Sequence, residues 1–453
     1  MAVIGAGYVG LTISSCWAHL GHRVVCVEKD PARVSMMRAG RMPFFEPELD
    51  ALAQDTMARG DFSVTDVFRD AVEPADVVFV AVGTPSLPSG EPDLSAVDEV
   101  TDALCHGSRT DQVIAIKSTV PVGTTDRMAA ALRRRGAPAH VAHTPEFLAE
   151  GSAVADFLRP SRVIIGTRST VAARVLSSLY RSLGGPVVVT DPCTSEMTKY
   201  AANAFLATKV SFINHIATLC GHAGADVQAV ARGIGMDPRI GPHFLKPGVG
   251  FGGSCLPKDT RALISLATSY GVSSALFETV LDINEAQRRA FVDRLRSAAG
   301  PLDGTRIAVF GLAFKGGTSD IRESPALDIA GRLIAEGAAV RAYDPEAEEP
   351  ASRAVPGLFC CPGPYEAAHE ADVIAVLTDW AEFSELDWER LRRCVRHPLV
   401  VDGRGLPIAE PATAAGFTYL GPAAGGQTAA DRSGATEHPA GSSVPRSAGG
   451  QYR

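Results

Sequence analysis

AVIGAGYVGLTISSCWAHLGHRVVCVE, residues 2–28, is the stretch that decides the fold of this chain. It begins with a short apolar strand at residues 2–4, continues with an apolar helix over residues 11–20, and ends with a second strand at residues 23–27. A strand, a glycine-rich turn, a helix and a second strand form the unit with which doubly wound parallel sheets begin. The stretch therefore predicts an α/β fold.

The turn after the first strand has the spacing GxGxxG, with Gly5, Gly7 and Gly10. The first glycine permits the tight turn, the second lets the backbone approach a pyrophosphate, and the third lets helix and strand pack closely. Glu28 follows the second strand, where a carboxylate accepts hydrogen bonds from ribose hydroxyls and repels a 2′-phosphate. These residues together predict that the cofactor is NAD rather than NADP.

Three further apolar strands are predicted in this region, and each ends in a loop. They are residues 75–82 before Gly83-Thr84-Pro85, residues 112–117 before the loop 118–123, and residues 140–142 before the loop 144–151. Ligands of open α/β sheets sit beyond the carboxyl ends of strands, so we expect these loops to face the cofactor. Glu146 and Glu150 are four residues apart, which predicts that they share a helix face. Beside a pocket they are candidates for proton transfer.

From Ser195 onward the pattern becomes helical, with a helix starting at Ser195 and further helices over residues 226–230 and 260–295. Lys199 and Asn203 are four apart and share a face of the first helix. Such a pair on a solvated surface is usually inert. The sequence alone leaves open whether this pair is functional.

GVGFGGSCLPKD, residues 248–259, is the second informative stretch. Its glycines allow the backbone to bend and a ligand to approach closely. Cys255 follows them, and the nearby Lys258 ammonium is expected to favour the reactive thiolate form of the cysteine. The alternative is a buried structural cysteine, because free cysteines are often buried. The dinucleotide pattern elsewhere favours a nucleophile in a nicotinamide enzyme.

The fold restarts near residue 306. Strands are predicted at residues 306–310 and 339–343, with a helix over residues 324–336, and the stretches 371–378 and 398–405 also fit a doubly wound domain. The first loop of this second α/β region lacks GxGxxG, so it need not bind a second dinucleotide. We predict domains at residues 1–190, 191–298 and 299–420. Residues 421–453, rich in Gly, Ala, Ser and Pro, predict a disordered tail.

Composition limits the possible partners and compartments. A chain of 453 residues needs more than one core, and a net charge of −8 argues against nucleic acid as a partner. The nine cysteines show no CxxC spacing, which predicts reduced thiols, no bound metal and a cytoplasmic location. We expect no signal peptide and no membrane segment. The first strand starts almost at Met1, which suggests a slightly truncated start.

Several motifs together resemble the UDP-glucose/GDP-mannose dehydrogenase family. From Ala2 to about Leu420 they are GAGYVG, PFFEP, GTP, KSTVPVGT, TPEFLAEG, PSRVIIG, SEMTKYAANAFLATKVSFIN, DPRIG, GVGFGGSCLPKD, GLAFKGGTSDIRESPA and VVDGRG. The resemblance implies two Rossmann-like doubly wound domains joined by a helical segment with a long helix. It also implies a homodimer or larger homo-oligomer, and a four-electron oxidation of a nucleotide sugar at C6 that uses two NAD and one water.

The resemblance also implies residue roles. Cys255 would capture the C6 aldehyde as a thiohemiacetal and later carry a thioester. Lys199 and Asn203 would stabilise charge on the C6 oxygen, Asp259 with Thr119 would hold water or accept a proton, and Glu146 would assist hydrolysis. The implied NAD contacts are Gly5, Gly7, Tyr8, Val9, Gly10, Glu28, Arg33, Thr84, Pro85, Thr119, Glu150, Lys258 and Arg322. The implied nucleotide-sugar contacts are Glu146, Phe147, Leu148, Glu150, Lys199, Asn203, Arg239 of a neighbouring subunit, Phe244, Leu245, Lys246, Gly248, Gly250, Phe251, Gly252, Phe314, Lys315 and Arg404.

Two residues depart from the family pattern, and the one beside the cysteine leaves the substrate open. Leucine follows the cysteine in SCLPKD, as is frequent in the GDP-mannose branch, whereas AANAFLATKVSFIN resembles the UDP-glucose branch. His215 stands where the family commonly has an acidic residue. We weigh the longer match more heavily and expect UDP-glucose, with GDP-mannose or a UDP-N-acetylhexosamine as alternatives. A non-catalytic nucleotide-sugar binder is the alternative from another class.

Overall fold

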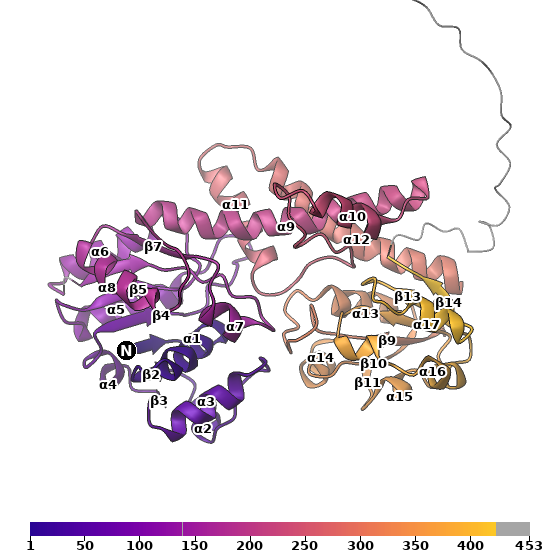
Figure 1. The fold of residues 1–453 in the computed structure, drawn as a ribbon, viewed down its shortest axis with the longest axis horizontal. Coiled ribbons are helices and arrows are strands. Elements are labelled where there is room, and N and C mark those ends of the chain that lie inside the picture. The colour runs from indigo at the N-terminus through magenta and orange to yellow at the C-terminus, as the bar shows by residue number, and fades with distance from the viewer. Residues whose placement is uncertain (138, 423–453) are drawn as a thin grey trace, which may run out of the picture.

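The structure, a computed structural model, describes residues 1–137 and 139–422. Two sheets, each with helices, are joined by a helical segment (Figure 1). The α/β fold with two Rossmann-like doubly wound domains and a central helical segment is confirmed. The predicted disordered tail, residues 421–453, lies outside the described residues from position 423 onward.

The first domain contains an eight-stranded sheet of order β3-β2-β1-β4-β5-β6-β7-β8. All neighbouring strands are parallel except β6 and β7. The strand order reverses between β1 and β4, and in such sheets ligands bind at this switch point beyond the carboxyl ends. The strands are β1 Ala2–Ile4, β2 Val24–Val27, β3 Phe62–Thr65, β4 Val77–Val80, β5 Val113–Ile116, β6 His140–His143, β7 Val163–Thr167 and β8 Val187–Thr190.

Helices cover both faces of this sheet, and separate apolar cores fill the two sides. Trp17 lies fully buried in one of these cores, against Phe157 and Tyr180. The helices are α1 Tyr8–His19, α2 Pro31–Arg38, α3 Leu49–Ala58, α4 Phe68–Val72, α5 Ser95–Gly107, α6 Thr124–Arg134, α7 Ala153–Leu158 and α8 Thr170–Arg181.

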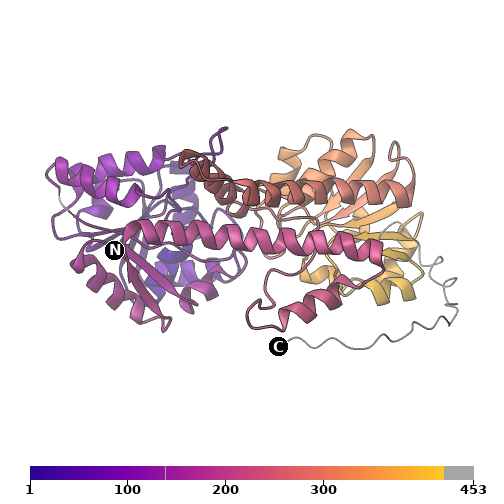
Figure 2. The ribbon, with the colours of Figure 1, turned by 90° about the horizontal axis from the view of Figure 1, so that it is seen from above.

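The helical segment is built on one long helix. It consists of α9 Pro192–Ala223, α10 Val227–Gly235, α11 Leu256–Ser269 and α12 Ala275–Ala299. With 32 residues, α9 is roughly 48 Å long and runs from the first domain toward the second, with α12 beside it (Figure 2). A side chain at Gly166 of β7 would meet the Ser195 Cβ at 2.3 Å, so the glycine lets α9 pack directly on the sheet.

One predicted helix boundary in this segment is wrong. The helix expected to start at Ser195 begins at Pro192, because the Asp191 carboxylate accepts a hydrogen bond from the Thr194 N–H at 3.0 Å and caps it. The helical stretch expected over residues 260–295 consists of two helices, α11 and α12. Gly271, which has a positive φ of 67°, lies in the break between them.

The second domain has a six-stranded parallel sheet of order β11-β10-β9-β12-β13-β14. Its strands are β9 Arg306–Phe310, β10 Ala339–Tyr343, β11 Phe359–Cys360, β12 Val373–Val376, β13 Leu399–Asp402 and β14 Thr418–Leu420. Its helices are α13 Pro325–Ala335, α14 Glu348–Ala354, α15 Pro364–Ala367, the 3-10 turn η1 Ala381–Ser384, α16 Trp388–Cys394 and α17 Ala409–Ala414. All six strands of the second sheet thus follow the order of the first six strands of the first sheet, and both sheets have their switch point beside the first strand.

Candidate active site

Cys255 lies directly before the first turn of α11, at the end of a glycine-rich loop. Two buried asparagines hold this loop from neighbouring helices. Asn214 of α9 accepts from the Gly248 N–H at 2.8 Å, and Asn284 of α12 accepts from the Phe251 N–H at 2.7 Å and donates to its carbonyl at 3.0 Å. The backbone before the cysteine is therefore fixed by side chains of the helical segment.

The same loop passes very close to the second domain. A side chain at Gly252 would meet the Glu323 carbonyl oxygen at 2.3 Å, and one at Gly253 would meet the Phe314 ring at 2.8 Å. The Gly253 N–H donates to the Arg322 carbonyl at 2.9 Å. These glycines are needed because the backbones of the two segments touch.

The Cys255 thiol is partly accessible, but its environment disfavours a thiolate. Burial raises its pKa to about 11, and the negative charge of Glu146 adds to this effect while Lys199 opposes it. The prediction that the Lys258 ammonium favours the thiolate of Cys255 is wrong, because that ammonium pairs with the Asp259 carboxylate at 2.5 Å. Cys255 is therefore a thiol at neutral pH, and any attack by its sulfur requires transfer of the thiol proton to another group.

Lys199 forms a buried ion pair with Glu146. The Nζ–Oε1 distance is 2.9 Å, and the two side chains are 3% and 7% exposed. Burial disfavours the charged form of each group, but their mutual attraction outweighs it, so the pKa of Glu146 is lowered and that of Lys199 is raised. Both groups are therefore charged at neutral pH.

Asn203 lies one turn further along α9 and donates to Asp259 of α11. The Nδ2–Oδ2 distance is 2.6 Å, and the Asp259 side chain is completely buried. The predicted common face of Lys199 and Asn203 is thus turned toward the cysteine-bearing helix. The structure brings together a thiol, an ammonium, an amide and two carboxylates.

The loop 144–151 is not helical, so the prediction that Glu146 and Glu150 share a helix face is wrong. The extended backbone lets them point to different partners. Glu146 faces Lys199 and also accepts from the Leu148 N–H at 2.5 Å. Phe147, between them in the sequence, stacks under the Arg162 guanidinium at 3.6 Å from its ring centre.

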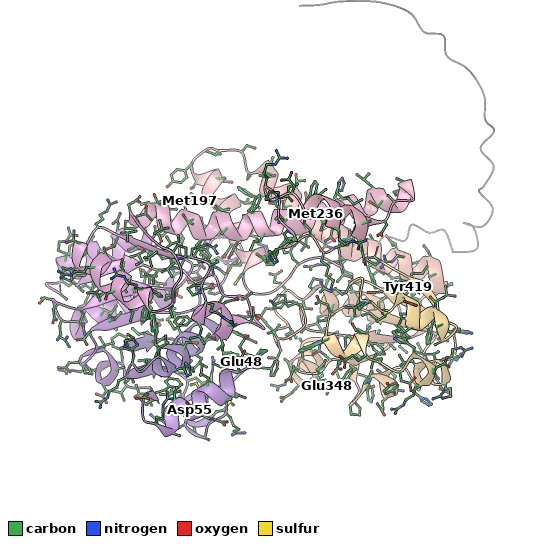
Figure 3. The ribbon with its side chains drawn as sticks, in the orientation of Figure 1. Glu48, Asp55, Met197, Met236, Glu348 and Tyr419 are labelled. Carbon is green, nitrogen blue, oxygen red and sulfur yellow. The ribbon has the colours of Figure 1, made fainter. Side chains whose placement is uncertain are left out.

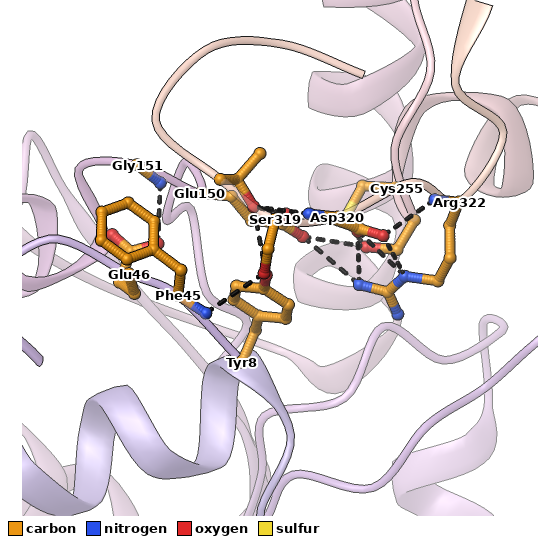
Figure 4. Close-up of polar contacts among 11 residues, drawn as sticks. Tyr8, Phe45, Glu46, Glu150, Gly151, Cys255, Ser319, Asp320 and Arg322 are labelled. Atoms are coloured by element: carbon orange, nitrogen blue, oxygen red, sulfur yellow. Dashed lines mark hydrogen bonds and ion pairs between the residues drawn. The ribbon is translucent and has the colours of Figure 1, made fainter. Parts of the chain in front are cut away.

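Glu150 contacts the second domain and the residue beside the cysteine (Figure 4). Its carboxylate accepts from Ser254 Oγ at 3.3 Å and Thr318 Oγ1 at 3.1 Å, and lies 3.5 Å from Arg322 Nη2. Burial, with repulsion from Asp320, raises the pKa of Glu150 to about 8 although Arg322 opposes this. Arg322 itself pairs with Asp320 at 2.6 Å.

The glycine-rich turn of the first domain fits a dinucleotide. Gly5 has a positive φ of 103°, and a side chain at Gly10 would meet the Gly5 carbonyl oxygen at 1.7 Å, so turn and helix are in contact. A side chain at Gly7 would meet nothing within 4 Å, and α1 begins there without a capping side chain. This leaves an open helix N-terminus, which suits a pyrophosphate.

The other residues expected at NAD surround this turn. Glu28 follows β2 and accepts from the Asp30 N–H at 3.1 Å, while Arg33 donates to the Ala6 carbonyl at 2.7 Å and lies 3.7 Å from Glu28. Thr84 Oγ1 donates to the Thr119 carbonyl at 2.9 Å, which joins the loops after β4 and β5.

Tyr8, in the first turn of α1, contacts the second domain. Its ring stacks on Phe44 with centroids 3.8 Å apart, and its hydroxyl lies 3.1 Å from Thr318 Oγ1. Phe45 donates its N–H to Ser319 Oγ at 3.2 Å (Figure 4). Residues 318–322 therefore reach across to the turn that would hold NAD. Val9, next to Tyr8, is half-buried, and Pro85 is exposed beyond Thr84.

Several residues expected at the nucleotide sugar lie on the second domain or on the loop 244–252 between α10 and α11. Arg404 is anchored to the carbonyls of Leu377 and Phe314 at 2.6 and 2.9 Å, and its Nη1 would lie 3.4 Å from a side chain at Gly248. Lys246 lies 3.4 Å from Asp379. Further expected contacts in this area are the buried Leu245, Lys315 with its Nζ 5.6 Å from the Phe314 ring centre, and Gly250, whose φ is positive.

Arg239 and Phe244 are exposed and do not join this group. Arg239 pairs with Asp237 at 2.6 Å, in a side chain that is 88% exposed. Phe244 has an unusual positive φ of 62° and is 41% exposed. Within one chain, the structure therefore brings neither of them to the cysteine.

Glu196 was missed from the sequence, where it reads only as a charge in a first helical turn. Its fully buried carboxylate accepts from the N–H groups of Gly123 and Thr125 at 2.6 and 2.8 Å, and from Thr125 Oγ1 at 2.6 Å. It caps α6 from α9 and so fixes the loop that contains Thr119. Asn214 and Asn284 were missed as well, and for Asn284 the charged and polar residues around it in the sequence gave no signal of its burial.

Three family models match consecutive parts of the chain. They describe the NAD binding domain, central domain and UDP binding domain of the UDP-glucose/GDP-mannose dehydrogenase family, at residues 1–184, 193–286 and 308–407. The chain belongs to this family. Residues 1–184 match the NAD binding domain of the family, and they include the open turn at Gly7 and the carboxylate of Glu28 described above. NAD is therefore the cofactor of this family member.

Individual relatives cover nearly the whole chain of this dehydrogenase. The UDP-glucose 6-dehydrogenase of Rhizobium meliloti is 45% identical over 92% of this chain and 98% of that protein. The UDP-glucose dehydrogenase structure from Pyrobaculum islandicum is 37% identical with a TM-score of 0.86, covering 93% and 97% of the two chains. The UDP-D-ManNAc dehydrogenase structure from Pyrococcus horikoshii is 30% identical with a TM-score of 0.82, covering 94% and 100%. In the part of the dehydrogenase that the structure describes, no helix is long and apolar enough to cross a membrane.

Proposed function

We propose that this protein is a UDP-glucose 6-dehydrogenase that oxidises UDP-glucose to UDP-glucuronate with two NAD and one water. The observation that carries the proposal is the grouping of Cys255 with the Lys199–Glu146 ion pair and the Asn203–Asp259 hydrogen bond. The similarity to UDP-glucose 6-dehydrogenases along nearly the whole chain supports this choice of substrate. The match of residues 308–407 to a UDP binding domain supports a uridine nucleotide.

In the proposed reaction, Lys199 and Asn203 donate hydrogen bonds to the C6 oxygen as it gains charge. Fixed donors in a buried site are effective because they need no reorganisation when charge develops. The buried partners Glu146 and Asp259 hold both donors in place. In this proposal Asp259, with Thr119, holds a water or accepts the hydroxyl proton.

NAD binds in this proposal at the turn Gly5–Gly10, with Tyr8 and Val9 beside it and Glu28 at its ribose. The chemistry that NAD supplies is the acceptance of a hydride from carbon in each oxidation. Around it we place Arg33, Thr84, Pro85, Glu150, Lys258 and Arg322. The contacts of Tyr8 and Glu150 with the second domain support closure of the two domains over the site.

Cys255 retains the aldehyde between the two oxidations. Its sulfur bonds to the aldehyde carbon while the thiol proton passes to the aldehyde oxygen, which gives a thiohemiacetal. The raised pKa of the thiol fits this step, because the proton must be delivered to that oxygen in any case. After the second oxidation, the resulting thioester is hydrolysed with help from Glu146.

The nucleotide end of the substrate lies in this proposal against the second domain. Lys246, Lys315 and Arg404 supply positive charge for a diphosphate, and the loop 248–252 offers backbone N–H groups. Phe147, Leu148, Leu245 and Phe314 line the sugar and base. Phe244 is a further contact in this proposal, and Arg239 would complete the site from a neighbouring subunit.

A homodimer or larger assembly is part of the proposal. Phe205, Phe212 and Leu219 of α9 are 66%, 50% and 53% exposed and are spaced seven residues apart, which places them along one side of the helix. Met197 and Met236 add exposed apolar surface on the helical segment (Figure 3). A stripe of this kind is typical of a subunit interface. Light scattering of a Phe205→Glu, Phe212→Glu double variant should detect monomers.

We place the enzyme in the cytoplasm, where its nine unpaired cysteines would remain reduced. The function is tested by incubating the purified protein with NAD and UDP-glucose, GDP-mannose, UDP-N-acetylglucosamine or UDP-N-acetylmannosamine. Two NADH per UDP-glucose, with UDP-glucuronate as the product, is the expected result. Faster oxidation of another nucleotide sugar would make that sugar the substrate. Binding of a nucleotide sugar without formation of NADH would favour a non-catalytic binder.

A further inference from the structure

A cavity in the first domain leads toward Glu146 from the side of the sheet core. Its volume is about 130 Å³. Lys117, Glu146 and Tyr180 line its inner part, and Arg159, Ser161 and Arg162 line its outer part. Arg159 and Ser161 are exposed, whereas Lys117 and Tyr180 are buried. The cavity therefore lies between the protein surface and the carboxylate that pairs with Lys199.

Lys117 is an unusual group to find at the inner part of this cavity. Its ammonium lies 3.3 Å from the Pro145 carbonyl and 3.4 Å from the Tyr180 hydroxyl, both neutral acceptors. Among residues 1–137 and 139–422 it forms no ion pair, and its side chain is 5% exposed. Burying an ammonium without a close counter-charge costs free energy. A third N–H donor of the ammonium is left for another partner.

We infer that this cavity supplies the water that hydrolyses the thioester, and that Lys117 is a positioning residue that holds this water against Glu146. The inference rests on the proposed function, which requires one water per sugar. A cavity of this size is larger than the roughly 10–15 Å³ that a single water needs, so it has room for water. Glu146 can accept further hydrogen bonds, because each carboxylate oxygen has two acceptor sites and, in the part of the chain that the structure describes, the donors to it are Lys199 and the Leu148 N–H.

Entry from this side suits the order of the reaction. The sugar stays bonded to Cys255 until hydrolysis is complete, so a water that comes through the first domain does not need the nucleotide sugar to leave. The water oxygen bonds to the C6 acyl carbon, the carbon–sulfur bond breaks, and its electron pair leaves with the sulfur. One water proton passes through Glu146 to the Cys255 thiolate. The other remains on the carboxylic acid, which ionises in solvent.

The test is Lys117→Met in the full-length protein, which removes the ammonium and keeps an unbranched side chain. A rapid burst of two NADH per active site should survive, because both oxidations precede hydrolysis. Steady-state turnover should then fall about 10- to 100-fold, the range expected when assistance to proton transfer is impaired. Intact-mass measurement should show the uronyl thioester on Cys255, and added hydroxylamine should restore turnover by replacing water as the nucleophile.

A purely structural Lys117 predicts different results. It would leave turnover per folded molecule normal and lower the melting temperature on replacement. For a positioning Lys117 the melting temperature should stay equal or rise, because replacing a buried charge with an apolar side chain is often neutral or stabilising. Loss of the burst, normal steady-state turnover, or lower activity without a thioester would each overturn the inference. Tyr180→Phe is the second variant, and it decides the matter if Lys117→Met does not fold. It removes one contact of the ammonium and should give a several-fold fall with detectable thioester, whereas unchanged turnover would overturn the inference. Wild-type protein that forms no NADH with any nucleotide sugar would overturn the proposed function itself.

Discussion

The two Rossmann-like domains differ most at the same place in their folds, the loop after the first strand. In the first domain, residues 5–7 connect β1 directly to α1, and Gly7 leaves the helix N-terminus open. In the second, residues 311–324 lie between β9 and α13. Part of this longer loop crosses to Tyr8 and Glu150. The same topology thus forms a cofactor turn in one domain and a contact between domains in the other.

The carboxylates that follow the second strands differ in the same way. Glu28 follows β2 and accepts one backbone N–H. Asp344 follows β10 and accepts five donors: the N–H groups of Leu312, Ala313, Glu346 and Ala347, and the Trp380 indole N–H. Asp344 is completely buried and has little capacity left for a ribose. A carboxylate at this position indicates dinucleotide binding only if the adjoining loop leaves it free.

Cys255→Ser, at the place where the two domains meet, should have the largest effect on turnover of the variants considered. Loss of a nucleophile typically costs several orders of magnitude, so we expect turnover to fall by at least about 10³-fold while both ligands still bind. NADH formed per folded active site, with a melting curve of the same sample, measures this. Cys16→Ser is the control: it replaces a buried core thiol and should cost stability while turnover per folded molecule stays near normal. Near-normal turnover of Cys255→Ser would remove the cysteine from the mechanism.

Asp344→Ala should destabilise the protein by on the order of 3 kcal/mol, because several buried donors lose their acceptor. Its affinity for NAD should change little if the second domain does not bind the cofactor. Thermal melting and the KM for NAD, measured on the same preparation, give both results. A large rise in the KM for NAD without loss of stability would contradict the contrast between the two carboxylates.

Glu28→Ala should change cofactor preference and leave stability nearly unchanged, which is the reverse of the result expected for Asp344→Ala. Wild-type enzyme should strongly prefer NAD, since the carboxylate repels a 2′-phosphate. Removing a repulsion of about 1–2 kcal/mol should raise kcat/KM with NADP, relative to NAD, about tenfold. Stability should change little, because Glu28 accepts only one backbone hydrogen bond and lies 3.7 Å from Arg33. Comparable efficiency of the wild type with NADP would show that this carboxylate does not select the cofactor.

Local patterns allowed much of the fold to be predicted from the sequence. The strands at residues 306–310 and 339–343 agree with β9 and β10 residue by residue, because continuous apolar runs are typical of buried parallel strands. The four-residue spacing of Lys199 and Asn203 also predicted their common face correctly. Where the helix start was wrong, the capping side chain of Asp191 lay just outside the apolar pattern.

The remaining features depend on residues that are distant in the sequence. Lys199 pairs with Glu146, Glu196 with Thr125, and Asn284 with Phe251. Each pair is formed only when separate elements pack, so no local spacing reveals it. The pKa of Cys255 is a sum over the same packed site, in which burial outweighs the positive charge that the neighbouring sequence suggested. Residue types therefore indicated the chemistry, whereas partners and charge states required the structure.

The last pair of predictions concerns the pH dependence of stability, and begins with Glu150, where the loop of the second domain meets the first. Burial raises the pKa of this carboxyl to about 8, so the folded protein binds a proton that the unfolded chain releases near its ordinary pKa of 4.5. Wild-type stability should consequently fall, relative to Glu150→Gln, as the pH rises from 4.5 to 8, because the folded state then binds more protons. Melting temperatures of the two proteins across this range should diverge by several degrees.

Glu323→Gln provides a control of opposite sign. Its hydrogen bond from Arg261 lowers the pKa of Glu323, so this carboxylate stabilises the fold above its ordinary pKa and the benefit is lost as the pH falls. Wild-type stability relative to Glu323→Gln should thus rise with pH, although only slightly, since the side chain is 40% exposed. If the Glu150→Gln difference did not depend on pH while the Glu323→Gln difference did, the docking of residues 318–322 on Glu150 would not persist in solution. The contrast between the two first loops would then be one of length alone.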